Sequence, residues 1–265
     1  MKQQLQLVSN WIQNYAQTNG IKSLVIGVSG GIDSALVSYL CALTGMKTYV
    51  VSMPIHQPKS HLSRASNHIA WLQEKFPNVE AKFVDLSTAF DILDTDLFEV
   101  IDGENQLCSA NTRSRLRMTT LYHIATAKNG IVVGTGNKVE DFGVGFFTKY
   151  GDGGVDISPI ADFMKSEVRE MASAAGINQE IIDAVPSDGL WEGDLSDEQQ
   201  IGASYDELEW AMKMIEVHGT DPGDLAYLQL SLNTREKQVL EIYNRFNTKN
   251  RHKMVAIPVY NRSNQ

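Results

Sequence analysis

The segment from Gly27 to Ser34 combines residue types that suit the binding of a phosphate. It reads Gly-Val-Ser-Gly-Gly-Ile-Asp-Ser and stands between an apolar run and a helical pattern. At such a turn, backbone N–H groups point from the positive end of a helix, and adjacent glycines let a phosphate approach closely. Ser29 and Ser34 add hydroxyl donors, and Asp33 adds a carboxylate where a phosphate-bound Mg²⁺ would sit. The segment therefore predicts a nucleotide phosphate site.

The loop differs from two common phosphate-binding motifs. No Gly-Lys-Ser/Thr closes it, as in a Walker A loop, and it lacks the dinucleotide spacing G-x-G-x-x-G. An ordinary strand–helix turn capped by Asp33 is the simpler alternative. The string Ser29–Ser34 instead resembles the loop of the N-type ATP pyrophosphatases. That resemblance implies cleavage of ATP between its α- and β-phosphates, transfer of AMP to an acceptor oxygen and release of pyrophosphate.

Two further strings bring glycines and charged residues together. Gly134–Glu140 follows an apolar run, and Glu140 offers a second carboxylate for Mg²⁺, although a solvent-exposed turn would explain the string as well. In Gly145–Ile160, three glycines stand within four residues around Asp152, with Lys149 nearby. A plain loop rarely needs this density of glycine, aromatic and charged residues, so the string indicates a second part of the site.

The apolar pattern predicts the elements that position these strings. We expect strands over 23–28, 48–53, 79–84 and 130–134, alternating with helices over 2–18, 33–44, 60–76, 87–97 and 106–128. This alternation predicts an α/β fold with a parallel sheet flanked by helices. The loops after the first and fourth strands should therefore meet at one edge of the sheet.

The C-terminal part is predicted to be helical. Helices are expected over 165–175, 205–217 and 234–245, with irregular structure over 142–160. Residues 186–200 are acidic and contain glycines, which suggests a mobile lid. No repeat or linker is evident, so residues 1–265 are predicted to form a single domain.

Taken together, the three strings resemble the NAD synthetase family of N-type ATP pyrophosphatases. The resemblance extends from Gly27 to the pair His252-Lys253. It implies a Rossmann-like fold of the adenine nucleotide alpha hydrolase type, a homodimer, and the use of ATP and Mg²⁺. The implied reaction is the amidation of deamido-NAD (nicotinic acid adenine dinucleotide) to NAD through an adenylated intermediate, with AMP and pyrophosphate as products.

The resemblance also assigns roles to individual positions. The implied catalytic residues are Asp33, Lys165 and Asp156, and the implied Mg²⁺ ligands are Asp33 and Glu140. The residues implied in ATP binding are Gly27, Val28, Ser29, Gly30, Gly31, Ile32, Asp33, Ser34, Thr135, Lys165 and Ser187. Those implied in deamido-NAD binding are Arg115, Lys149, Asp156, His252 and Lys253. Ser187 replaces the family's usual threonine, and the segment after Pro54 departs from the pattern of commoner bacterial members.

Other charged residues admit simpler interpretations. Arg113 and Arg117 would share one face of a helix while Arg115 points elsewhere, and a solvated charged face would explain all three. By position alone, His252 and Lys253 would be surface residues of the tail. The spacing of His61 and His68 matches no metal site and suggests the surface of a helix.

Composition limits the class of protein. The 265 residues have a net charge of −9, which disfavours a nucleic-acid binder. No run of about 18 apolar residues and no apolar signal segment is present, so no membrane association is expected and the cytoplasm is the expected location. The two cysteines, Cys41 and Cys108, are expected in core helices, without a disulfide.

The nitrogen donor is expected to be free ammonia. Glutamine-using relatives carry an additional amidase domain with a cysteine nucleophile, and the sequence before Gly27 offers no room for one. Delivery of ammonia by a separate subunit is the alternative. A tRNA-thiolating enzyme or a GMP-synthesis module would share the loop, but the former would need a basic surface and more cysteines. A nucleotide-sensing module without chemistry would not need Asp33, Glu140 and Lys165, all of which are present.

Overall fold

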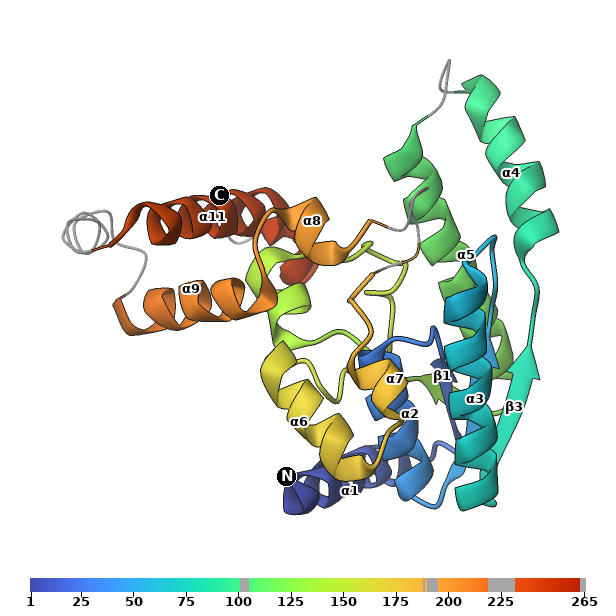
Figure 1. Ribbon diagram of the computed structural model, residues 1–265. Coiled ribbons are helices and arrows are strands. Elements are labelled where there is room, and N and C mark those ends of the chain that lie inside the picture. The colour runs from blue at the N-terminus through green and yellow to red at the C-terminus, as the bar shows by residue number, and fades with distance from the viewer. Residues whose placement is uncertain (101–104, 188, 190–194, 219–231, 263–265) are drawn as a thin grey trace.

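A parallel sheet forms the centre of the molecule. The computed structural model describes residues 1–100, 105–187, 189, 195–218 and 232–262 (Figure 1). The sheet has the strand order β3-β2-β1-β4, and every pair of neighbours is parallel. Its strands are β1 (Ser23–Gly27), β2 (Lys47–Ser52), β3 (Val79–Phe83) and β4 (Gly130–Val132). The predicted α/β fold and the four predicted strands are therefore confirmed.

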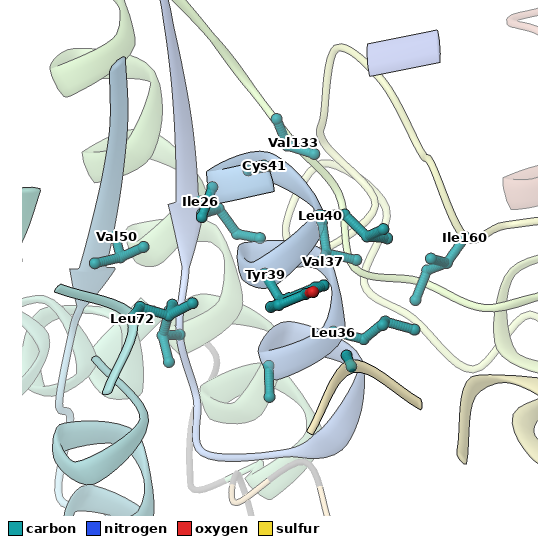
Figure 2. Close-up of a cluster of buried hydrophobic side chains, with 14 of the residues drawn as sticks. Ile26, Leu36, Val37, Tyr39, Leu40, Cys41, Val50, Leu72, Val133 and Ile160 are labelled. Carbon is teal, nitrogen blue, oxygen red and sulfur yellow. The ribbon is translucent and has the colours of Figure 1, made fainter. Parts of the chain in front are cut away.

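Helices cover both faces of this sheet. They are α1 (Lys2–Thr18), α2 (Ile32–Leu43), α3 (Lys59–Lys75), α4 (Ser87–Val100) and α5 (Gln106–Ala127). Successive residues of β1 point to opposite faces: Leu24 and Ile26 pack in the core with α1 and α2, whereas Val25 packs with Ala125 of α5. Figure 2 shows the first of these cores, with Ile26 and Val50 of the sheet beside apolar side chains of α2.

The C-terminal half of the chain is mostly helical. Its elements are the π-helix η1 (Val139–Val144) and the helices α6 (Lys165–Ala175), α7 (Gln179–Ile182), α8 (Asp197–Ile201), α9 (Tyr205–His218) and α11 (Thr234–Met254). Buried residues of η1, α9 and α11 make a separate apolar cluster. Figure 1 shows α9 and α11 side by side, on the opposite side of the molecule from α3 and β3. None of the described helices is long and apolar enough to cross a bilayer.

Four elements of this half differ from the sequence prediction. The predicted irregular segment begins inside η1, and the short helices α7 and α8 were not predicted. Helix α11 continues to Met254, beyond the predicted end at residue 245, and the three basic residues of its last turn favour the negative C-terminal end of the helix. His252 and Lys253 are therefore helical residues, and not part of an extended tail.

Some predicted environments were wrong. His61 and His68 are buried because α3 packs against α2, where His68 Nε2 lies 2.9 Å from Ser38 Oγ. Cys108, predicted in the core, is exposed in the first turn of α5, whereas Cys41 is buried as predicted. The lid predicted over 186–200 includes residues 188 and 190–194, which lie outside the described residues.

The strand order creates an opening at the carboxyl edge of the sheet. β2 and β3 lie to one side of β1, and β4 lies to the other. The order of the strands therefore changes direction between β1 and β4, which is where ligands bind in open parallel sheets. Gly27–Ser34 and Gly134–Glu140 follow these two strands, so the predicted convergence of the two strings is confirmed.

Candidate active site

A cavity of about 290 Å³ lies at this edge of the sheet. Segments that follow β1, β2 and β4 line it, together with residues of α3, α5 and α6. It is lined by ten of the sequence-predicted ATP residues, namely Gly27, Val28, Ser29, Gly31, Ile32, Asp33, Ser34, Thr135, Lys165 and Ser187. The backbone carbonyl of the eleventh, Gly30, accepts a hydrogen bond from Arg64 Nε at 3.2 Å. The folded chain thus gathers the predicted ATP residues around one hollow.

Hydrogen bonds within the loop after β1 fix its shape. Ser34 Oγ donates to the Gly31 carbonyl at 2.9 Å and accepts from the Ser29 N–H at 3.2 Å. Ser29 Oγ accepts from the Gly31 N–H at 3.2 Å. Gly31 is also the N-cap residue of α2, just before the helix begins at Ile32. The two serines therefore hold the loop itself in place, and the N-terminus of α2 provides the backbone N–H groups suited to an anion.

Lys165 joins the two predicted metal ligands. Its Nζ lies 2.6 Å from Asp33 Oδ2 and 3.0 Å from Glu140 Oε1, and its side chain is 2% exposed. Burial alone would lower the pKa of this ammonium, but the charges of Asp33 and Glu140 outweigh burial and raise the pKa. Lys165 is therefore a charged group at neutral pH, and it brings the two carboxylates within reach of a single cation.

Two buried residues orient these carboxylates. Asn137, which has no exposed surface, donates to Asp33 Oδ1 at 3.1 Å, and its Oδ1 accepts from the Glu140 N–H at 3.1 Å. Tyr205 donates to Glu140 Oε1 at 2.6 Å, and its hydroxyl lies 3.1 Å from Asp197 Oδ2. Helices α8 and α9 are thereby connected to the cluster of Lys165.

The cavity carries more acidic than basic groups. Its described lining residues include five acidic side chains, on Asp33, Glu140, Asp141, Asp152 and Asp197, and three cations, on Arg64, Arg117 and Lys165. Burial, together with the charges of Glu140, Asp152 and Asp33, raises the pKa of Asp141 to about 8, so Asp141 is mainly protonated at neutral pH. A divalent cation that enters with an anionic ligand would favour the ionised forms of these acidic groups.

The residues predicted to bind deamido-NAD lie beside the cavity and not among its described lining residues. Four of them form one group between α5 and α11. Arg115 Nη2 lies 3.4 Å from the Lys149 carbonyl, and Lys149 Nζ donates to the His252 carbonyl at 3.1 Å. Lys253 Nζ donates to the Phe147 carbonyl at 2.7 Å. The structure therefore brings these four basic residues together.

Asp156 and the arginines of α5 occupy different environments. Asp156 accepts hydrogen bonds from the Val132 N–H at 2.7 Å and from the Tyr122 hydroxyl at 3.1 Å. Arg117 lines the cavity, and its Nε donates to the Met53 carbonyl at 3.1 Å. Arg113 instead lies over the ring of Phe90, at 4.5 Å from the centroid.

Several residues of the site were missed at the level of sequence. Asn137 stands inside the string Gly134–Glu140, and its position three residues before Glu140 was the signal available in the sequence. Asp197 and Tyr205 belong to no motif, and only the packing of α8 and α9 brings them to Glu140. Arg64 gave no signal, because a single arginine on a predicted helix is usually a surface residue.

Comparison with known sequences agrees with this geometry. The family model for NAD synthase matches residues 4–256. An NH(3)-dependent NAD(+) synthetase of Methanococcoides burtonii is 38% identical over 212 residues, which span 79% of this chain and 78% of that protein. One of Mycoplasmopsis pulmonis is 38% identical over 200 residues, spanning 75% of this chain and 74% of that protein.

Solved structures have the same architecture. The NMN synthetase from Francisella tularensis superimposes with a TM-score of 0.82 at 29% identity, over 98% of both chains. The NH3-dependent NAD synthetase from Campylobacter jejuni superimposes with a TM-score of 0.76 at 24% identity, over 98% of this chain and 99% of that one, and this likeness supports the fold. From the extent of the family match and the identity to its relatives, we conclude that the chain belongs to the NAD synthase family.

Proposed function

We propose that this protein is an ammonia-dependent NAD synthetase, which amidates deamido-NAD to NAD at the expense of ATP. The observation that carries the proposal is the cluster of Lys165, Asp33 and Glu140 beside the loop Gly27–Ser34. A phosphate loop with a buried ammonium and two carboxylates suits the handling of a nucleotide polyphosphate. The family match and the relatives named above support the same activity.

The chemistry requires activation of a carboxylate. Ammonia cannot displace oxide from the nicotinate carboxylate, because oxide is a very poor leaving group. The carboxylate oxygen therefore attacks the α-phosphorus of ATP, the bond to the β-phosphate oxygen breaks, and pyrophosphate leaves. Ammonia then attacks the acyl carbon, AMP departs, and the nitrogen loses a proton. The enzyme chiefly has to align two anionic molecules and offset their charge.

The residues of the cavity can serve these steps. The N–H groups at the start of α2 would hold the departing pyrophosphate, and the ammonium of Lys165 would offset charge that develops on the phosphates. Asn137 and Tyr205 would keep the carboxylates of Asp33 and Glu140 oriented. Asp156 remains a proposed substrate contact, as the family resemblance implies.

Mg²⁺ is the proposed metal. The residues present fit it, because Asp33 and Glu140 offer carboxylate oxygens within reach of one cation. In the described ranges, no group of three or more His, Cys, Asp or Glu side chains could hold a metal. A Mg²⁺ ion here would therefore share its coordination with phosphate oxygens and water, as is usual for this ion. When bound, the ion would neutralise charge on the phosphates.

The basic group beside the cavity is the proposed site for deamido-NAD. Hydrogen bonds link Arg115 to Lys149 and Lys149 to His252, and Lys253 follows His252 on α11. A dinucleotide carries a pyrophosphate that such basic groups can bind. The set lies next to residues that line the cavity, such as Phe147. The two substrates would thus occupy adjacent parts of one site.

A homodimer and a single-domain enzyme in the cytoplasm complete the proposal. The family resemblance implies the dimer, and exposed apolar side chains on α4 and α5 support it, including Ile92, Leu97, Phe98 and Leu107. Such side chains are commonly buried in a homodimer interface. Free ammonia as the nitrogen donor agrees with the names of the curated relatives.

A mononucleotide acceptor is the second candidate. It is favoured by the similarity over 98% of the chain to a structure described as an NMN synthetase. Nicotinic acid mononucleotide presents the same carboxylate but lacks the adenylate half. The two acceptors can be separated directly, by measuring pyrophosphate release from ATP, Mg²⁺ and ammonium with each acceptor. We expect the dinucleotide to be preferred by kcat/KM, and preference for the mononucleotide would replace the proposal by the second candidate.

A further inference from the structure

Arg64 is a cation of the cavity whose charge is not matched within the described part of the chain. It lies on α3, is half-buried, and lines the cavity. Its Nε donates to the Gly30 carbonyl at 3.2 Å, and Arg64 forms no ion pair with any described residue. This hydrogen bond leaves the other N–H groups of the guanidinium free for another acceptor. A partly buried guanidinium of this kind favours an anionic partner.

The packing of α3 places Arg64 directly beside the phosphate loop. Gly30 has a φ of +89°, and a Cβ at that position would lie 2.5 Å from the His61 carbonyl and 3.4 Å from Arg64 Cβ. Glycine at position 30 therefore lets the first turns of α3 lie against the loop. The contact fixes the base of the Arg64 side chain at the loop that surrounds the N-terminus of α2.

Few other cations of the described residues could offset the negative charge of a phosphate bound at the loop Gly27–Ser34. The loop contains no lysine, unlike a Walker A loop. Lys165 already contacts Asp33 and Glu140, and it comes from α6, which packs on α2 as α3 does (Figure 1). Arg64 is thus the cation that reaches the loop from α3 and is not engaged by a described carboxylate.

We infer that Arg64 is a further nucleotide-binding residue, which contacts the β- and γ-phosphates of ATP and the pyrophosphate released from them. The planar guanidinium suits two phosphate oxygens at once, and its bond to Gly30 fixes its orientation. The inference rests on the proposed function in one respect, which is that the bound nucleotide is ATP. It assigns no role in activating the acceptor.

The test is equilibrium binding with matched variants. Arg64→Gln removes the charge but keeps an amide that can donate to the Gly30 carbonyl. Lys59→Gln removes the same charge from an exposed position in the first turn of α3, outside the described cavity lining, and serves as the control. Calorimetric titration with ATP, inorganic pyrophosphate and AMP, each with Mg²⁺, gives the three dissociation constants.

For Arg64→Gln, we expect the Kd of ATP and of pyrophosphate to rise about ten- to hundredfold, the usual effect of losing charge-assisted hydrogen bonds. The Kd of AMP should change little, because AMP lacks the phosphates in question, and Lys59→Gln should match the wild type for all three ligands. An unchanged Kd for ATP, or an equal loss for AMP, would overturn the inference.

Two further comparisons keep the test decisive. If Arg64→Gln does not fold, Arg64→Lys replaces it. Loss of the forked geometry should weaken the binding of ATP and pyrophosphate several-fold, and wild-type affinity would contradict the inference.

NAD formation by the wild type is measured separately. Wild-type synthesis of NAD with unchanged ATP binding in Arg64→Gln would overturn the role of Arg64 alone. Loss of pyrophosphate binding in a protein that makes no NAD would overturn the proposed function alone.

Discussion

At the scale of single residues, the site depends on how the buried ammonium of Lys165 is balanced. Asp33 and Glu140 contact it directly, and Asn137 and Tyr205 hold those carboxylates in position. Removing one partner of such a buried group leaves charge that its neighbours no longer offset. The carboxylates therefore matter both for the chemistry and for the local arrangement of the site.

The first prediction concerns Asp33. Asp33→Asn keeps the shape of the side chain but removes a charge from Lys165 Nζ and from the proposed metal site. We expect kcat for pyrophosphate release to fall about 100-fold or more, the usual effect of losing one preorganised electrostatic contact. The measurement is steady-state pyrophosphate release, with circular dichroism as the check on folding. Asp162→Asn, whose side chain is 94% exposed, is the control, and turnover near the wild-type rate in Asp33→Asn would remove Asp33 from its proposed role.

At the scale of elements, the contact between α3 and the loop after β1 depends on the glycine at position 30. The second prediction is that Gly30→Ala destabilises the protein more than Gly45→Ala does. Both glycines have positive φ, +89° and +73°, but a Cβ on Gly45 would meet nothing within 4 Å, whereas one on Gly30 would meet the His61 carbonyl. We expect a loss of about 1 kcal/mol for Gly45→Ala and at least about 2 kcal/mol for Gly30→Ala in urea denaturation. Equal losses would show that α3 does not constrain the loop.

The contact between α2 and α3 also has a pH dependence. Burial lowers the pKa of His68 from 6.5 to about 4, so the folded protein keeps this histidine neutral while the unfolded chain binds a proton below pH 6.5. The unfolded state therefore binds more protons between pH 6.5 and 4, and the free energy of unfolding falls as the pH is lowered through this range. The third prediction is a loss of up to about 3 kcal/mol across it.

Urea denaturation at several pH values measures this effect. His68→Gln lacks the titrating group, and its stability should depend less on pH than that of the wild type. His123→Gln, at an exposed position of α5, should keep the wild-type pH dependence. If wild type and His68→Gln lose stability in parallel below pH 6.5, the buried histidine is not the cause.

These elements also show what a sequence can reveal. Apolar runs that end in glycine-rich strings identified β1 and β4, and parallel pairing then required both loops to share one edge. The burial of His68 could not be read in the same way, because a histidine counts as polar until its partner, Ser38, is known. Tyr205 and Arg64 reach the site only through the packing of helices, which leaves no local pattern in the chain.

At the scale of the whole molecule, the exposed apolar face of α4 and α5 bears on assembly. The fourth prediction is that the wild type is a dimer and that Phe98→Glu, on the exposed side of α4, shifts it toward the monomer. Light scattering after size-exclusion chromatography measures the mass. Leu7→Glu, at an exposed position of α1, should leave the mass unchanged. A dimer that Phe98→Glu leaves intact would place the interface on another face. A wild-type monomer would contradict the proposed dimer.

The most direct test of the proposed function is the complete reaction with the purified protein. The protein is supplied with ATP, Mg²⁺ and deamido-NAD, together with either ammonium or glutamine, and NAD, AMP and pyrophosphate are measured. The proposed function predicts that ammonium supports NAD formation with equal amounts of AMP and pyrophosphate, and that glutamine alone supports little. Absence of NAD with ammonium, or release of ADP and phosphate in place of AMP and pyrophosphate, would contradict it. NAD formed from glutamine alone at a comparable rate would contradict the proposed nitrogen donor.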